Sequence, residues 1–174
     1  MLGFETTERY DELLEEDADA TSLSGGDFES NVAVQSSYYL TVMDGWFKAP
    51  STGNFRFYMS CDDECKLEFD DTNHYATGNA YSLTNVLEQN SWMKFRSYLQ
   101  PAGSWAQTVN DVKTSSFSLT GGNYYRIRGQ HKNHSGNSHF TVSLMAENAF
   151  TTLADGSNHP NGQREIQVFE IDQD

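Results

Sequence analysis

The strongest constraint on this fold is a series of short runs, beginning near residue 36, in which apolar and polar side chains alternate. One run places Phe55, Phe57 and Met59 on one side of an extended chain and polar residues on the other, as in a half-buried strand. A second run places Leu67 and Phe69 in the same way. Only a short polar gap separates the two runs, so they predict a tight hairpin.

Further runs of this kind follow along the chain, and turn residues such as Gly121, Gly122 and Gly136 separate them. Helix is expected only as one turn near Tyr10 and another around residues 83–87. The predicted fold class is therefore all-β, an antiparallel and jelly-roll-like β-sandwich. About eight strands are expected, at residues 38–47, 53–60, 66–70, 92–99, 116–119, 124–129, 140–146 and 165–171.

The only two cysteines, Cys61 and Cys65, lie four positions apart. A structural zinc site would need a second pair of ligands, and a redox motif would have two residues between the cysteines rather than three. The favoured interpretation is a small disulfide that clamps a turn. Closing so short a ring contributes only about 2 kcal/mol, so its expected role is to fix the shape of the turn. Such a bond implies an oxidising compartment.

The chain divides by composition into two parts. Residues 1–35 are acidic and poorly patterned, and they predict a lead-in packed on the domain, whereas residues 36–174 predict a single sandwich. The start at Met1 has neither a basic region nor an apolar signal core. Two interpretations stay open: a segment of a larger secreted protein, which is favoured, or an intracellular chain whose two thiols are free.

The charge of the chain excludes some classes of partner. With 11 Lys and Arg against 25 Asp and Glu, the net charge is −14, a field that repels nucleic acid and anionic membranes. No apolar run approaches the roughly 18 residues of a membrane span. The sequence also lacks the G-x-S-x-G, H-E-x-x-H, P-loop and G-x-G-x-x-G motifs, so no enzyme is predicted and no catalytic residue is named.

Three consecutive carboxylates, from Asp62 to Glu64, lie between the two cysteines. Adjacent carboxylates repel one another unless water or a cation compensates them, and a hard cation such as calcium takes six to eight oxygen ligands. An ordinary solvated acidic turn is the alternative. One loop can hardly supply every ligand, so a second must converge on it; the candidates are the polar stretch 131–139 and the group of Asp70, Asp71 and Asn73.

Two other features concern carbohydrate. Asn133 begins the only N-x-S/T acceptor sequence, so it is a candidate glycosylation site if the chain is secreted. A glycan on Asn133 and a metal-ligand role for Asn133 exclude each other. Trp105 lies in a loop and is a candidate platform for a sugar ring, whereas Trp46 and Trp92 lie in apolar runs and are expected in the core.

Residues 44–70 resemble the PA-fourteen family, which is named for a segment of anthrax protective antigen and occurs in yeast flocculins, bacterial adhesins and glycosidases, and animal fibrocystins. The resemblance consists of a strand, a G-x-F-x-A-P-x-S/T-G-like turn, an aromatic strand, the Asp62-Asp63 pair and the Leu67-Glu68-Phe69-Asp70 run. Weaker similarity extends over residues 38–171. The cysteines that bracket the aspartates are similar to the fibrocystin-type branch.

This resemblance implies a β-sandwich within an extracellular multidomain protein. In sugar-binding members of the family, adjacent aspartates joined by a cis peptide bond hold a calcium ion that contacts sugar hydroxyls. Carried over, Asp62 and Asp63 become the metal pair and bind carbohydrate together with Trp105, and Asn133 and Asn137 are nominated as further metal ligands. The expected function is a calcium-dependent carbohydrate-binding and adhesion module at the cell surface, with glycans as partners.

An alternative from the same resemblance is a structural domain that binds neighbouring extracellular domains in a large extracellular or ciliary surface assembly, without binding sugar. In that case the aspartate pair is merely inherited.

Overall fold

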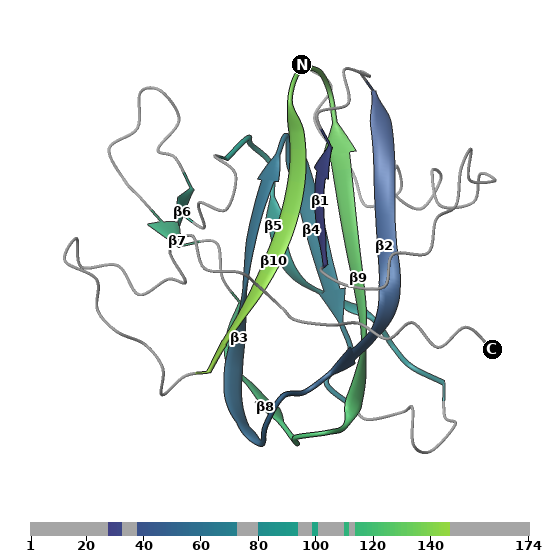
Figure 1. Ribbon diagram of the computed structural model, residues 1–174, viewed down its shortest axis with the longest axis vertical. Helices are drawn as coiled ribbons and strands as arrows, with labels where there is room; N and C mark the ends of the chain where they lie inside the picture. Colours follow the sequence, from purple (N-terminus) through teal and green to yellow (C-terminus); the bar gives the residue numbers. More distant parts are fainter. Residues whose placement is uncertain are drawn as a thin grey trace.

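The computed structural model describes residues 28–32, 38–72, 80–93, 99–100, 110–111 and 114–146, and all regular elements in these ranges are strands (Figure 1). They are β1 (Glu29–Val32), β2 (Tyr39–Lys48), β3 (Gly53–Asp62), β4 (Glu64–Phe69), β5 (Thr84–Gln89), β6 (Leu99–Gln100), β7 (Asn110–Asp111), β8 (Phe117–Leu119), β9 (Tyr124–Asn133) and β10 (Ser138–Ala146). No helix in these ranges is long and apolar enough to cross a membrane.

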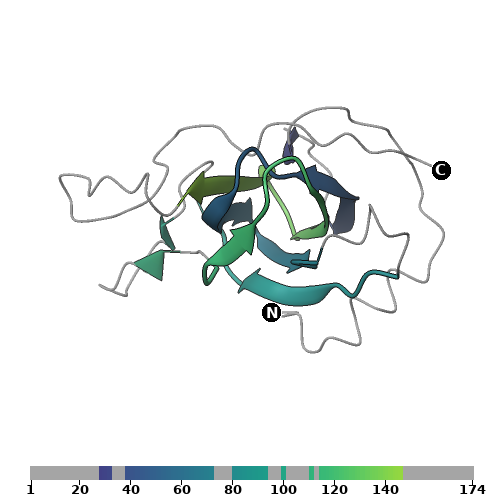
Figure 2. The same cartoon turned by 90° about the horizontal axis from the view of Figure 1, so that it is seen from below.

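Two four-stranded antiparallel sheets pack face to face, and Figure 2 shows them as two layers. One has the strand order β1-β10-β3-β8 and the other the order β2-β9-β4-β5; β6 and β7 form a separate pair. Apart from β4 and β5, the neighbours in these two sheets are not consecutive in the chain, as expected for a jelly-roll-like arrangement. The predicted all-β antiparallel sandwich is confirmed.

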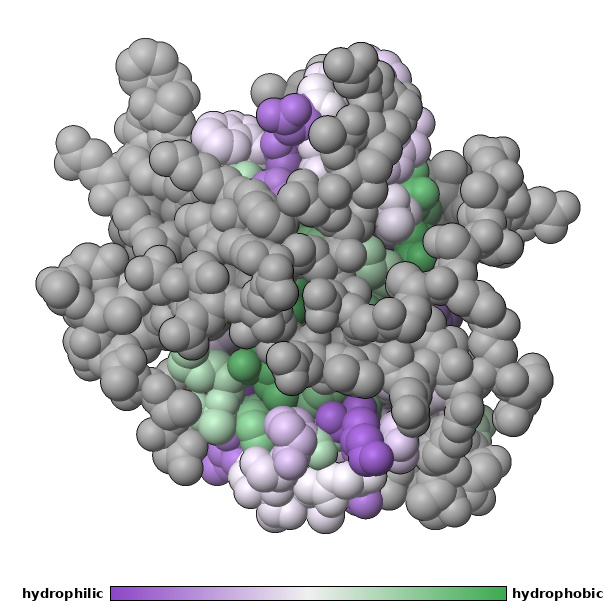
Figure 3. Space-filling model, in the orientation of Figure 1, coloured by the Kyte–Doolittle hydropathy of each residue, from purple (hydrophilic) through white to green (hydrophobic). Residues whose placement is uncertain are grey.

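The core fills the space between the two sheets because inward residues of both follow the period of two. Phe57, which is fully buried, has ring centroids 5.9 Å from Phe47 and 4.8 Å from Phe69, both in edge-to-face geometry. On the face seen in Figure 3, strongly hydrophobic residues lie in the body of the sandwich and hydrophilic ones gather toward its upper and lower ends. The alternation that predicted the strands therefore also identified the core.

The predicted hairpin between residues 53–60 and 66–70 is wrong. Strand β3 pairs with β10 and β8, whereas β4 pairs with β9 and β5, so the two strands belong to different sheets. Their alternating patterns were correct, but alternation does not say which strands pair. The acidic turn between them is therefore a crossing from one layer to the other.

Three smaller expectations are also corrected. Residues 83–87, expected as a helical turn, contribute instead to β5, because the edge of β4 supplies backbone partners for an extended chain. Trp46 lies on the outer face of its sheet, since its neighbour Phe47 faces inward. Trp92 is 50% exposed, while the adjacent Met93 is buried.

Part of the predicted lead-in lies in the sandwich. Strand β1 pairs with β10 from Glu29–Thr141 to Val32–Ser138, and Phe28 packs edge to face on Phe140 at 5.9 Å. The turn near Tyr10 and the strand at 165–171 lie outside the described residues, and the boundary at residue 35 stays a prediction.

The glycine in the middle of β9 provides a test of the packing. A Cβ atom added at Gly129 would lie 2.6 Å from the Phe140 ring and 2.8 Å from that of Phe28. We expect Gly129→Ala to destabilise the domain by about 1 to 3 kcal/mol through overpacking, seen as a lower midpoint in thermal unfolding. Gly53→Ala is the control, because its Cβ would meet only Phe55, at 3.7 Å. Equal midpoints for the two variants would contradict this packing.

Candidate functional site

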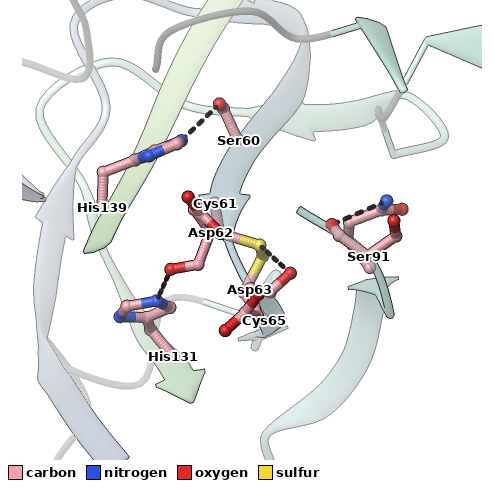
Figure 4. Close-up of a disulfide and its surroundings, with 9 residues drawn as sticks. Ser60, Cys61, Asp62, Asp63, Cys65, Ser91, His131 and His139 are labelled. Carbon is pink, nitrogen blue, oxygen red and sulfur yellow. Dashed lines mark hydrogen bonds between the residues drawn. A yellow bond between two sulfur atoms is a disulfide. The ribbon is translucent and has the colours of Figure 1, made fainter. Parts of the chain in front are cut away.

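The acidic crossing between the sheets lies at one end of the sandwich, the upper end in Figure 1. Strand β3 ends at Asp62 and β4 begins at Glu64, so Asp63 is the single residue between them. The peptide bond between Asp62 and Asp63 is cis, as the family resemblance implies. The predicted disulfide is confirmed: Cys61 and Cys65 are bonded, fully buried and 6.2 Å apart at Cα, so they tie the two sheets together directly at the crossing (Figure 4).

The β9–β10 loop converges on this crossing, as expected for the polar stretch 131–139. Strand pairing places Lys132 opposite Glu64 and His139 opposite Asp62, so each end of the loop is fixed to one side of the acidic turn. The backbone N–H of His134 donates a hydrogen bond of 2.7 Å to Oδ2 of Asp63. Two segments about 70 residues apart therefore form one site.

The imidazole of His131 holds the backbone of the aspartate pair. Its Nε2 lies 2.6 Å from the carbonyl oxygen of Asp62, and because a carbonyl only accepts, Nε2 must carry the proton. Figure 4 shows the ring directed at this oxygen. The ring also stacks on Phe140, with centroids 6.1 Å apart, and meets Tyr39 edge to face. His131 thus fixes the plane of the peptide that joins the two carboxylates.

Burial lowers the pKa of His131, although its hydrogen bond to Asp62 and the charge of Asp63 act in the opposite direction. The ring is therefore neutral near pH 7. A protonated imidazole at this place would bring a positive charge next to the carboxylates. Because the ring of His131 is neutral, it does not compensate the negative charge of the two carboxylates.

The carboxyl group of Asp62 is unusually basic. Burial, then repulsion from Asp63, then a hydrogen bond with Asp63 raise its pKa from 3.8 to about 6. Such a shift arises where two carboxylates share a site that water does not fully solvate. A bound cation would relieve both the desolvation and the repulsion.

The two asparagines nominated as further ligands differ in their surroundings. Asn133, the last residue of β9, is fully buried, whereas Asn137 is exposed in the loop. Their amide oxygens and the loop carbonyls are the same class of donor as the Asp62 and Asp63 carboxylates. Among the described residues no three His, Cys, Asp or Glu side chains form a metal-binding group. A metal here would take its remaining ligands from amides, carbonyls or water, and such an all-oxygen set suits a hard cation.

Other candidates from the sequence lie elsewhere. Asp70 accepts hydrogen bonds from the backbone N–H groups of Thr72 and Ser82, so its carboxylate is used in ordering its own loop. Trp105 lies outside the described residues. Asn133 has no exposed surface on which the folded domain could carry a glycan.

Sequence reasoning included His131 in the candidate polar stretch 131–139 but missed its inward position in β9 and its contact with the backbone of Asp62. Its signal was the alternation itself: Tyr125 and Ile127 face inward, and the same period of two, continued past Gly129, reaches His131 and Asn133. The predicted strand stopped at residue 129, so these two polar side chains were assigned to a loop. A polar residue at an inward position of a strand is the pattern that would have identified them.

The sequence profile of the GLEYA domain matches residues 39–146, more than half of the chain and nearly all of the sandwich described above. The chain belongs to the GLEYA domain family. No comparison supports the fibrocystin-type branch that the cysteine pair suggested, and that expectation is corrected. No curated protein matches the chain.

Several solved structures resemble this GLEYA domain over part of their length. The A domain of Epithelial Adhesin 9 from Candida glabrata, in complex with Galβ1-4GlcNAc, has 22% identity and a TM-score of 0.43, over 64% of this chain and 46% of that one. The A domain of Epithelial Adhesin 6 from the same organism, in complex with Galβ1-3GlcNAc, has 15% identity and a TM-score of 0.41, over 79% and 58%. The PA14 domain of the MpAFP antifreeze protein has 18% identity and a TM-score of 0.36, over 63% and 44%. The chain spans about half the length of these proteins.

The raised pKa of Asp62 predicts how the stability of the calcium-free GLEYA domain depends on pH. The native carboxyl keeps its proton up to about pH 6, whereas the unfolded chain releases it near 3.8, so the native state binds more protons between these values. The contribution of Asp62 to the free energy of unfolding is therefore complete below about pH 4 and is lost as the pH rises to about 6.

Thermal unfolding in calcium-free buffer from pH 4 to 7 measures this effect. We expect Asp62→Asn, which cannot ionise, to gain stability relative to the unmodified chain as the pH rises. The exposed Asp71 provides a charge-matched control, Asp71→Asn, for which no such gain is expected. A difference between Asp62→Asn and the unmodified chain that is the same at every pH would contradict the assignment.

Proposed function

We propose that this GLEYA domain is a module of a larger extracellular, cell-surface protein that binds carbohydrate through a calcium ion held at the Asp62–Asp63 crossing. The single observation that carries the proposal is that the aspartate pair is fixed against the β9–β10 loop by the hydrogen bond from the backbone N–H of His134 to Asp63. The resemblance of this pair to the calcium-binding aspartates of the PA-fourteen family supports the same function.

The residues at the crossing fit calcium. Asp62 and Asp63 would supply two carboxylates, and Asn133 and Asn137 would supply amide oxygens from the facing loop. Calcium accepts six to eight oxygens in flexible geometry, so these groups leave coordination positions for other oxygens. When bound, the ion would compensate the pair and offer these positions to neighbouring hydroxyls of a sugar.

The geometry of the crossing also suits recognition. The disulfide and the strand pairings on both sides hold the carboxylates in place before a ligand arrives, which lowers the entropic cost of binding. Residues 134–137 of the facing loop are exposed and would form the wall that a sugar contacts. Trp105 stays a proposed sugar contact, and we propose Asn133 as a metal ligand rather than a glycan acceptor.

The alternative is a structural domain that binds neighbouring extracellular domains without binding sugar. We find no contact among the described residues that favours this alternative. No comparison supports a ciliary location. This alternative becomes the outcome if the following tests are negative.

Thermal unfolding in millimolar calcium and in chelator tests the metal site. We expect calcium to raise the midpoint, because a ligand that binds only the native state stabilises it by about 2.7 kcal/mol at a hundred times its dissociation constant. Asp63→Asn should abolish the rise, whereas Asp71→Asn should retain it. Equal midpoints with calcium and with chelator, in the unmodified chain, would refute the calcium site.

A glycan array probed in calcium and in chelator tests the sugar site. We expect binding to a restricted set of glycans that disappears in chelator and in the Asp62→Asn, Asp63→Asn double variant. Galβ1-4GlcNAc belongs on the array, since it is the ligand in one of the similar solved structures. A domain that binds calcium but no glycan in either condition would point to the structural role instead.

A further inference from the structure

Tyr38, the residue immediately before β2, exposes its aromatic ring at the same end of the sandwich as the aspartate pair. Tyr38 is 67% exposed, more than any other large hydrophobic residue that the structure describes. Its φ angle is 65°, and no other non-glycine residue in the described ranges has a positive value. Bulky residues rarely adopt this conformation, and glycine or asparagine would adopt it at less cost.

The ring of Tyr38 is held in place by the loop that contacts the aspartates. It packs edge to face on the imidazole of His134, with ring centroids 4.7 Å apart. The backbone N–H of that same His134 donates the 2.7 Å hydrogen bond to Asp63. One residue therefore connects the exposed ring to a proposed calcium ligand.

The backbone next to Tyr38 is also fixed to both ends of this loop. Tyr39 lies opposite Asn133 in the β2–β9 pairing, and its hydroxyl donates a hydrogen bond to Oγ of Ser138, the first residue of β10. Because Asn133 precedes the exposed loop and Ser138 follows it, the start of β2 is attached to both ends of the loop. These contacts place the backbone of Tyr38 beside the loop, and the contact with His134 orients its ring.

The other exposed tyrosine in the described ranges has a different environment. The ring of Tyr81 lies 4.7 Å from the Arg126 guanidinium and 5.8 Å from the Trp46 ring, on the outer face of the second sheet. The ring of Tyr81 therefore makes a cation–π contact with Arg126 and an edge-to-face contact with Trp46, both within the domain. The ring of Tyr38, in contrast, packs on a single ring in the described part of the chain, that of His134.

We propose that Tyr38, supported by His134, is a second sugar subsite next to the aspartate pair. The C–H groups on the apolar face of a pyranose carry a small positive charge and would pack on the electron-rich face of the ring. The ligand class is then an oligosaccharide of at least two units, one on calcium at Asp62–Asp63 and the next on Tyr38. This inference rests on the proposed function and adds the size of the ligand to it.

The test compares monosaccharides with disaccharides that present the same terminal sugar. The probes are the methyl glycosides of galactose, mannose and glucose, set against lactose, α1-2-mannobiose and cellobiose, with affinities measured in calcium. The variants are Tyr38→Ala and Tyr38→Phe, with Tyr81→Ala as the control for loss of an exposed tyrosine. Thermal unfolding with calcium and with chelator is measured on every variant.

We expect the unmodified chain to bind its disaccharide more tightly than the matching monosaccharide. Tyr38→Ala should lower the disaccharide affinity roughly two- to tenfold, while monosaccharide affinity and the calcium-dependent rise in unfolding midpoint stay unchanged. Tyr38→Phe keeps the ring and should bind the disaccharide like the unmodified chain, as should Tyr81→Ala.

Two results would overturn the subsite. Unchanged disaccharide affinity in Tyr38→Ala, with calcium and sugar binding intact, would remove the subsite and leave the proposed function standing. Failure of the unmodified chain to bind calcium or any probe would remove the proposed function and the subsite with it.

Discussion

The crossing of the chain from one sheet to the other at Asp62 and Asp63 is the constraint on which the rest of the site depends. The chain changes sheet within one residue, and the Cys61–Cys65 bond ties the layers together beside it. Strands β10 and β9 pair with the residues before and after the crossing, so the loop between them must lie over it. The strand pairings of the two sheets are thus sufficient to place the polar β9–β10 loop against the two carboxylates.

The electrostatics of the crossing follow from this geometry. Two adjacent carboxyl groups are partly removed from water, and the pKa of Asp62 rises to about 6. The imidazole of His131 donates its hydrogen bond to the backbone of Asp62 and is neutral because burial lowers its pKa. A positive charge would therefore stabilise the aspartate pair, and the neutral ring of His131 does not supply one. Calcium binding at this place would stabilise the native domain as well as create a sugar site.

The strands and the fold class were largely predictable from the sequence, because the alternation of apolar and polar residues in short runs is a local property. The inward positions of Phe57, Leu67 and Phe69 followed from it, and so did the all-β class. Strand pairing was not predictable, since the pairing of β3 with β10 rather than β4 depends on contacts between distant segments. The aspartate pair was found by its unusual local charge. The contacts of His131 and Tyr38 were missed, because they arise only when β9, β10 and the start of β2 come together.

Direct measurement of bound calcium tests the central claim most simply. Isothermal titration of calcium into the metal-free domain at pH 7.5 should give one site per chain, and the double variant Asp62→Asn, Asp63→Asn should give none. The exposed Asp71→Asn change should leave the stoichiometry at one. No heat of binding and no retained ion in the unmodified chain, checked by equilibrium dialysis at millimolar calcium, would contradict the account.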